Sequence, residues 1–199
     1  MRTDLRVKSC QMAIDLSSIT DDELARLCRH GEGRAFRELY ERYRQPVINF
    51  AYRMLGDRDG AGDILQETFQ YFFRKLPGYR AEGRLRNLLF RVARNLCLNR
   101  LKKFRGLRTV PLDEALAVSG TTGESIIASL ETKELQEKAA EALKKIPEIY
   151  SEVIVLRILN GMSYRDIAAV VDCPEGTVKS RLHNGLELLR KELGRQGIK

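Results

Sequence analysis

Several residue types that often define small proteins are scarce in this sequence of 199 residues. There is no tryptophan, and the two histidines and four cysteines are scattered without a Cys-x-x-Cys pair. This spacing argues against a zinc site or a disulfide framework, so we expect reduced, mostly buried thiols. No apolar run approaches the roughly 18 residues of a membrane span. The N-terminus lacks the apolar block of a signal peptide, and we therefore expect a cytoplasmic protein.

Motifs that mark common enzyme sites are also missing. There is no Gly-x-x-x-x-Gly-Lys-Ser/Thr phosphate loop, no Gly-x-Ser-x-Gly elbow and no His-Glu-x-x-His motif. Asp63 and Glu67 are one helical turn apart, which would suit a cation or acid–base chemistry. Paired carboxylates on a helix more often face solvent or a partner. We therefore predict a protein that is not an enzyme and that has no metal and no cofactor.

Acidic residues are nearly absent from residues 71–108, where twelve lysines and arginines accompany a single acidic residue, Glu82. These cations repel one another unless an anion lies opposite, and the aromatic residues among them are typical of a nucleic-acid surface. Taken individually, Phe72, Phe73 and Phe90 are expected in the hydrophobic core.

The hydrophobic spacing predicts an all-α protein, with two small helical domains joined by a flexible acidic linker. Helices are expected over residues 21–28, 34–54, 62–76, 85–104, 130–146, 148–159, 164–171 and 175–193. Pro46 is expected to bend or divide the second of these helices. The domain boundaries are a poorly ordered N-terminal extension (1–19), a first domain (20–105), a linker (106–134), a second domain (135–195) and a tail (196–199).

Residues 161–193 predict a helix-turn-helix. Ser163, with Asp166 three residues later, suits the start of a helix. Asp172-Cys173-Pro174 suits a turn, because aspartate tolerates left-handed backbone and proline starts a helix better than it continues one. The second helix then offers a polar and cationic face to a DNA major groove. This face consists of Glu175, Thr177, Lys179, Ser180, Arg181 and His183. An ordinary helical hairpin with a charged face is the plainer alternative.

Three stretches, in this order, resemble bacterial sigma factors of the extracytoplasmic-function (ECF) group. They are AFRELYERYRQPVINFAYRMLGDRDGAGDILQETFQYFF, LRNLLFRVARN and GMSYRDIAAVVDCPEGTVKSRLHNGLELLRKEL. The resemblance covers about residues 20–105 and 135–195. It implies that the first domain, region 2, binds core RNA polymerase and melts the minus-ten element of promoter DNA. It implies that the second domain, region 4, binds the minus-thirty-five element, and that an anti-sigma factor is a partner.

The resemblance also assigns roles to individual residues. Polymerase binding is expected at Asp63, Gln66, Glu67 and Phe69. Contacts with the minus-ten element are expected at Tyr79, Arg80, Arg84, Arg86, Arg91, Arg94, Asn95, Arg100 and Lys102. The polar face of the helix-turn-helix is expected at the minus-thirty-five element. Leu88 replaces the tryptophan of the family, and Gly185 is expected to weaken its helix locally.

The loop before the basic helix is a candidate for strand opening. Gly78 and Gly83 flank residues 79–84, and the resemblance places this loop where region 2 captures an unstacked base. Cationic and aromatic groups can offset the few kilocalories per mole that extrusion of a base costs. A flexible solvent loop is the alternative.

Two other functions stay open at this stage. A stand-alone regulator would dimerise through the helix-turn-helix and sense a ligand with residues 20–105. A nucleic-acid enzyme would use a metal at Asp63 and Glu67. For a sigma factor, residues 109–137 can extend to about 100 Å, whereas two turns of DNA measure about 70 Å. The net charge of −5 on this segment would suit a positively charged polymerase channel or a solvated spacer equally.

Overall fold

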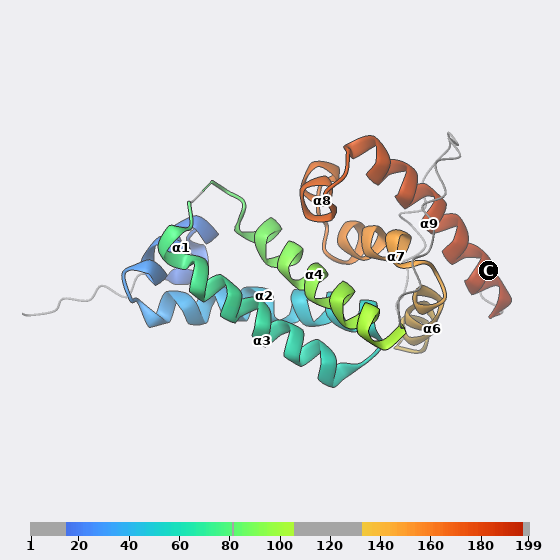
Figure 1. Cartoon of the computed structure of the whole chain (residues 1–199), viewed down its shortest axis with the longest axis horizontal. Coiled ribbons are helices and arrows are strands. Elements are labelled where there is room, and N and C mark those ends of the chain that lie inside the picture. Colours follow the sequence, from blue (N-terminus) through green and yellow to red (C-terminus); the bar gives the residue numbers. More distant parts are fainter. Residues whose placement is uncertain (1–14, 81, 106–132, 197–199) are drawn as a thin grey trace, which may run out of the picture.

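The structure is a computed structural model that describes residues 15–80, 82–105 and 133–196. Every regular element in these ranges is helical, as predicted (Figure 1). The elements are η1 (Leu16–Ser18), α1 (Asp21–Arg29), α2 (Gly33–Leu55), α3 (Arg58–Lys75), η2 (Leu76–Gly78), α4 (Leu85–Arg105), α6 (Lys133–Lys144), α7 (Glu148–Ile154), η3 (Val155–Leu159), α8 (Tyr164–Val171) and α9 (Glu175–Arg195). Within the described ranges, no helix is long and apolar enough to cross a bilayer.

The first helical group, α1 to α4, is built around three phenylalanines. Phe50 of α2, Phe72 of α3 and Phe90 of α4 are fully buried. The rings of Phe50 and Phe90 meet edge to face, with centroids 5.7 Å apart. Each such side chain stabilises the fold by about 1.5–3 kcal/mol relative to an exposed position. The prediction of a core position is thus confirmed for Phe72 and Phe90.

Two details of this group differ from the prediction. The helix α3 begins at Arg58 rather than at residue 62, because the Asp57 side chain caps it by accepting from the backbone N–H groups of residues 59 and 60. Pro46 does not divide α2, which continues as one helix. The cost of proline there is offset by the buried residues on either side of it, such as Val47.

Part of the expected N-terminal extension is ordered against the first group. Residues 16–18 form the 3-10 turn η1. The Arg42 guanidinium donates to the backbone carbonyls of Leu16, Ser17 and Ile19 at 2.9–3.0 Å. The expectation of a poorly ordered segment is therefore wrong for residues 16–19, and its remaining part up to residue 14 lies outside the described residues.

The second group, α6 to α9, contains the predicted helix-turn-helix. The Ser163 side chain caps α8 by accepting from the Asp166 N–H. Asp172 adopts left-handed backbone, with φ of 57°, and α9 starts directly after Pro174. Both local predictions are confirmed. The preceding helix α7 runs into one π-helical turn, η3, which the sequence pattern did not predict. Most of the predicted linker lies outside the described residues, but its last two residues belong to α6.

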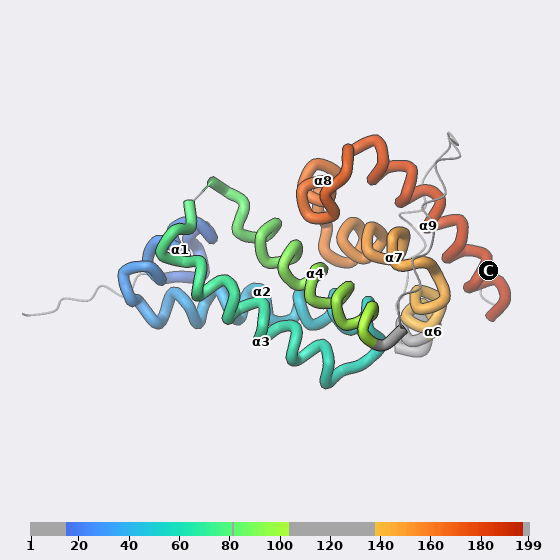
Figure 2. Tube along the Cα trace, in the orientation of Figure 1, coloured from blue at the N-terminus to red at the C-terminus, as the bar shows by residue number. Residues whose placement is uncertain are grey.

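The two groups pack against each other rather than standing apart. The basic helix α4 runs alongside α8 (Figure 2). The Asn87 amide of α4 donates to the Asp166 carboxylate of α8 at 2.8 Å. The Arg86 side chain of α4 donates to the backbone carbonyl of Asn160. One face of the basic helix is therefore covered by the second group.

Two predicted buried thiols are confirmed. Cys28 and Cys97 are free and buried, and burial raises the pKa of Cys28 to about 11 and that of Cys97 to about 12. Cys173, in the turn of the helix-turn-helix, is free and half-buried. Thiols with such raised pKa values carry little thiolate near neutral pH, so Cys28 and Cys97 act as packing residues.

Candidate polymerase and nucleic-acid interfaces

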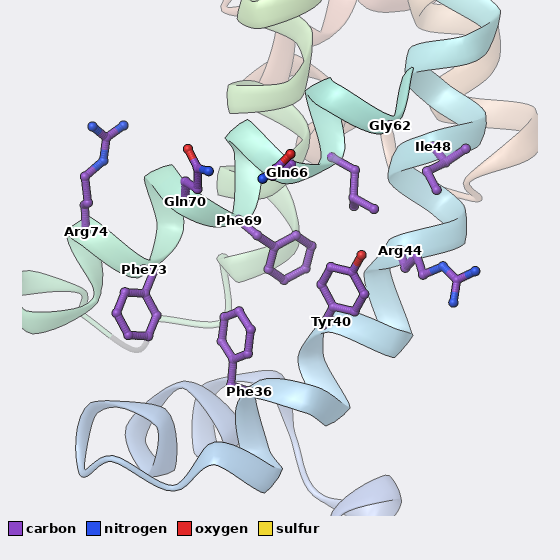
Figure 3. Close-up of a pocket in the computed structure, with 11 residues that line it drawn as sticks. Phe36, Tyr40, Arg44, Ile48, Gly62, Gln66, Phe69, Gln70, Phe73 and Arg74 are labelled. Carbon is purple, nitrogen blue, oxygen red and sulfur yellow. The ribbon is translucent and has the colours of Figure 1, made fainter. Parts of the chain in front are cut away.

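An aromatic groove of about 830 Å³ runs between α2 and α3 on the outside of the first group. Phe36 and Tyr40 of α2 face Phe69 and Phe73 of α3 across it (Figure 3). The ring centroids of Phe36 lie 6.0 Å from Phe69 and 5.7 Å from Phe73 in edge-to-face contacts. Aromatic pairs of this geometry stabilise one another and keep the groove preformed.

Phe73, which lines this groove, is a large aromatic side chain that is exposed to solvent. Its side chain is 59% exposed, whereas the neighbouring Phe72 is fully buried. Successive residues of a helix point about 100° apart, and here Phe72 points into the core while Phe73 lines the groove. The expectation that Phe73 belongs to the core is wrong. A large exposed aromatic side chain beside an apolar groove is typical of a protein-binding surface.

The four predicted polymerase-binding residues divide between two sides of α3. Gln66 and Phe69 line the aromatic groove. Asp63 and Glu67 instead face Arg100 of α4, at 2.9 Å and 3.6 Å. The carboxylates and Gln66 thus lie on adjacent strips of one helix. In the described residues no group of three acidic, histidine or cysteine side chains could hold a metal, so Asp63 and Glu67 gain no third candidate ligand there.

The residues of the predicted minus-ten surface fall into two classes. Exposed side chains belong to Arg80, Arg84, Arg91, Asn95 and Lys102. Half-buried side chains belong to Tyr79, Arg86, Arg94 and Arg100. Each half-buried side chain already has a protein partner. In the exposed class, Arg84 forms an exposed ion pair with Glu82 at 3.8 Å.

The predicted strand-opening loop is held from α1. The Asp22 carboxylate accepts from the Tyr79 hydroxyl at 3.2 Å and from the Gly83 backbone N–H at 2.6 Å. The Tyr79 ring packs edge to face on Phe72, with centroids 6.1 Å apart. Burial, followed by the charge of Asp22, raises the pKa of the Tyr79 phenol. Sequence analysis missed Asp22, because an aspartate in a first helical turn is ordinarily explained by the helix dipole.

The predicted polar face of the helix-turn-helix lies on α9, but Arg181 of that set is largely buried and lies 3.9 Å from Glu152. Lys179 is exposed, and its ammonium group lies 5.6 Å from the ring centroid of Tyr164 of α8. The Ser180 hydroxyl donates to the backbone carbonyl of Thr177 at 3.0 Å. Glu175 is exposed, and His183 is half-buried on the same helix. Short polar groups at the start of such a helix can reach base edges in a major groove.

Comparison with known proteins places these features in one family. The family model "Sigma-70 region 2" matches residues 39–106, and "Sigma-70, region 4" matches residues 136–189. The ECF RNA polymerase sigma-E factor of Haemophilus influenzae is 31% identical over 187 residues, covering 88% of this chain and 96% of that relative. The chain belongs to the ECF group of the sigma-70 family.

Solved structures of ECF-like fold agree with this assignment. The structure of CnrH in complex with the cytosolic domain of CnrY has a TM-score of 0.67 at 26% identity, covering 88% of this chain and 97% of that one. The sigma factor RpoE from Bartonella quintana, in complex with the anti-sigma factor NepR, has a TM-score of 0.62 at 24% identity, covering 80% and 96%. At that identity, the RpoE comparison shows a shared fold.

A buried carboxylate links region 2 to region 4 of this sigma factor. Glu152 of α7 is 1% exposed. The Arg94 guanidinium of α4 donates to its two oxygens at 2.6 Å and 3.0 Å, and Arg181 of α9 lies 3.9 Å away. Burial raises the pKa of Glu152, and the two arginines oppose this shift. Sequence analysis missed Glu152, because its position in a helical pattern does not reveal partners from distant segments.

Gly185 has a packing role in region 4 that the sequence did not reveal. A β-carbon at this position would lie 3.0 Å from Cδ1 of Ile154 and 3.1 Å from Cβ of Tyr150. Both neighbours belong to α7, so the missing side chain lets α9 approach α7 closely. The glycine lowers the helix propensity of α9, as expected, and also allows this contact.

Proposed function

We propose that this sigma factor binds core RNA polymerase and directs it to promoters with two separated elements. Region 2 (20–105) would bind polymerase and open the minus-ten element. Region 4 (135–195) would bind the minus-thirty-five element. The single observation that carries polymerase binding is the preformed aromatic groove, whose ring Phe73 stays 59% exposed although it contacts Phe36. Aromatic anchors of this kind dominate the free energy of many protein interfaces.

The DNA contacts are assigned to the two basic surfaces. Arg80, Arg84 and Arg91 are exposed on the loop and helix where the minus-ten element is expected. Lys179 and its neighbours on α9 would read the minus-thirty-five element. Each surface reads a short sequence, and the covalent link between them raises the effective concentration of the second contact once the first has formed.

We further propose that the protein has no catalytic activity of its own and acts in the cytoplasm, where core polymerase is found. We also propose control by an anti-sigma factor. Support for that partner comes from the fold shared with a sigma factor that was solved in complex with an anti-sigma factor. A stand-alone regulator is less well supported, because the chain belongs to the ECF group of the sigma-70 family.

The groove is tested by combining Gln66→Ala with Phe73→Ala. Both side chains line the groove without belonging to the buried core, so the melting temperature should stay near that of the wild type. Loss of an aromatic anchor costs about 2 kcal/mol or more at an interface, roughly a thirtyfold loss of affinity. Co-purification with core polymerase should therefore fail. Gln45→Ala, an exposed amide on α2 outside the groove, is the matched control. Normal assembly by the double variant would refute the placement of this interface.

A further inference from the structure

We propose that Asp22 is a positioning residue for promoter opening, which holds Tyr79 and Gly83 in place on the two sides of the loop proposed for strand opening. The proposal rests on the proposed function of region 2. In this role Asp22 does not contact DNA. Its carboxylate positions the residues next to the exposed arginines of the loop, and those arginines contact the DNA.

The Asp22 carboxylate ties both ends of the loop to one point. One oxygen accepts from the Tyr79 hydroxyl where the loop begins, and the other accepts from the Gly83 N–H where it ends, at 3.2 Å and 2.6 Å. Gly83 has left-handed backbone, with φ of 69°. The two oxygens of one carboxylate accept from both donors at once. Hydrogen bonds to an ionised acceptor are shorter and stronger than hydrogen bonds between neutral groups.

The helix that carries Asp22 is itself fixed independently. The neighbouring Asp21 accepts from Arg42 of α2 at 2.9 Å and from the Tyr43 hydroxyl. A capping box between Thr20 and Glu23 secures the start of α1. Asp21 and the capping box therefore hold α1 in place, while Asp22 is left to hold the loop.

The charge of Asp22 also fits a positioning role better than a DNA contact. An acidic side chain beside DNA phosphates is repulsive, yet this one lies within the basic loop region with both oxygens occupied by loop donors. With Tyr79 held against Phe72 and Asp22, Arg80 and Arg84 remain exposed on the loop. Residues that are held in place before binding lose less conformational entropy when a base is captured.

The experiment uses holoenzyme made with the full chain, on a duplex promoter selected by that holoenzyme. Asp22→Ala should leave polymerase assembly and duplex binding at the upstream box unchanged. Opening, followed by permanganate reactivity of unpaired thymines, should slow about tenfold. Asp22→Asn keeps an acceptor for the Gly83 N–H, and its opening rate should lie between those of the wild type and Asp22→Ala. On a template with a pre-melted bubble at the downstream box, all variants should match the wild type within about twofold.

Two controls separate the possible failures. Arg26→Ala changes an exposed residue of the same helix and should open promoters normally. Replacement of residues 79–84 by a Gly/Ser linker tests the proposed function of the loop itself. If the linker variant opens promoters at the wild-type rate, the loop has no role in melting. If the linker variant is slow but Asp22→Ala is not, the positioning role of Asp22 is wrong. If Asp22→Ala and Asp22→Asn both fail to assemble with polymerase, the positioning role is also wrong, because a structural role of Asp22 would explain that result.

Discussion

At the scale of single residues, Gly185 shows how region 4 achieves its packing. The closest neighbour of an added β-carbon, after the flexible end of Ile154, is Cβ of Tyr150, which cannot move without the backbone of α7. A tight contact with a side-chain end can relax by rotation, whereas a contact with Cβ displaces a helix. The close approach of α7 and α9 thus depends on the absence of a side chain.

We predict that Gly185→Val lowers the free energy of unfolding by about 1–3 kcal/mol, the usual cost of overpacking. Chemical denaturation of the full-length protein measures this change. Gly194→Val is the control, because the same substitution on the same helix meets no atom within 4 Å. Equal stability of the two variants would mean that α9 and α7 are not packed as closely as described.

Single residues also show where sequence reasoning succeeds. Ser163 and Asp172 were predicted correctly, because capping and left-handed backbone are local properties of a few neighbouring residues. Phe73 was predicted wrongly, because a helical pattern gives the direction of a side chain but not whether a partner covers it. Glu152 and Asp22 were missed, since their partners lie far along the chain.

At the scale of elements, the position of α4 against α7 and α8 constrains how region 2 can bind DNA. Arg94, a predicted minus-ten contact, is bound to the buried Glu152 of region 4. It cannot bind DNA while this ion pair persists. Removing one partner of a buried pair leaves an uncompensated charge, so opening of the pair is favoured when another anion takes the place of Glu152 beside Arg94. Promoter phosphates are such anions.

We therefore predict that region 2 and region 4 separate when α4 engages DNA, and that charge at position 87 biases this step. Asn87→Asp places a second carboxylate against Asp166, whose present bond with Asn87 measures 2.8 Å. Like charges so close repel, and the radius of gyration from small-angle X-ray scattering should increase. Asn87→Lys offers Asp166 an opposite charge and should keep the compact value. An unchanged radius in Asn87→Asp would contradict this opening.

The elements themselves were largely predictable from sequence. The α2, α4, α8 and α9 helices follow the spacing of their apolar residues within a few positions. The helix α3 begins earlier than predicted, because the Asp57 side chain caps it. The packing of α4 on α8 was not predictable, because hydrophobic spacing marks which face of a helix is buried and not which helix buries it.

At the scale of the whole molecule, two DNA-reading surfaces must reach two separate boxes. The structure places residues 133–137 in α6. The remaining residues, 109–132, can still extend to about 80 Å, which exceeds the roughly 70 Å of two helical turns of DNA. Separation of the regions is therefore compatible with the chain length. The hydrophobic spacing predicted this bipartite design, because helical periodicity breaks off in the segment after the basic helix and then resumes.

The most direct test mixes the protein with core RNA polymerase and genomic DNA and sequences the 5′ ends of the transcripts. The account predicts start sites that require the protein and share two boxes at a fixed spacing. The variant with Gln66→Ala and Phe73→Ala should lose them all, and Gln45→Ala should retain them. Transcripts identical to those of core polymerase alone would contradict the account, as would tight, dimeric binding of the free protein to a palindrome.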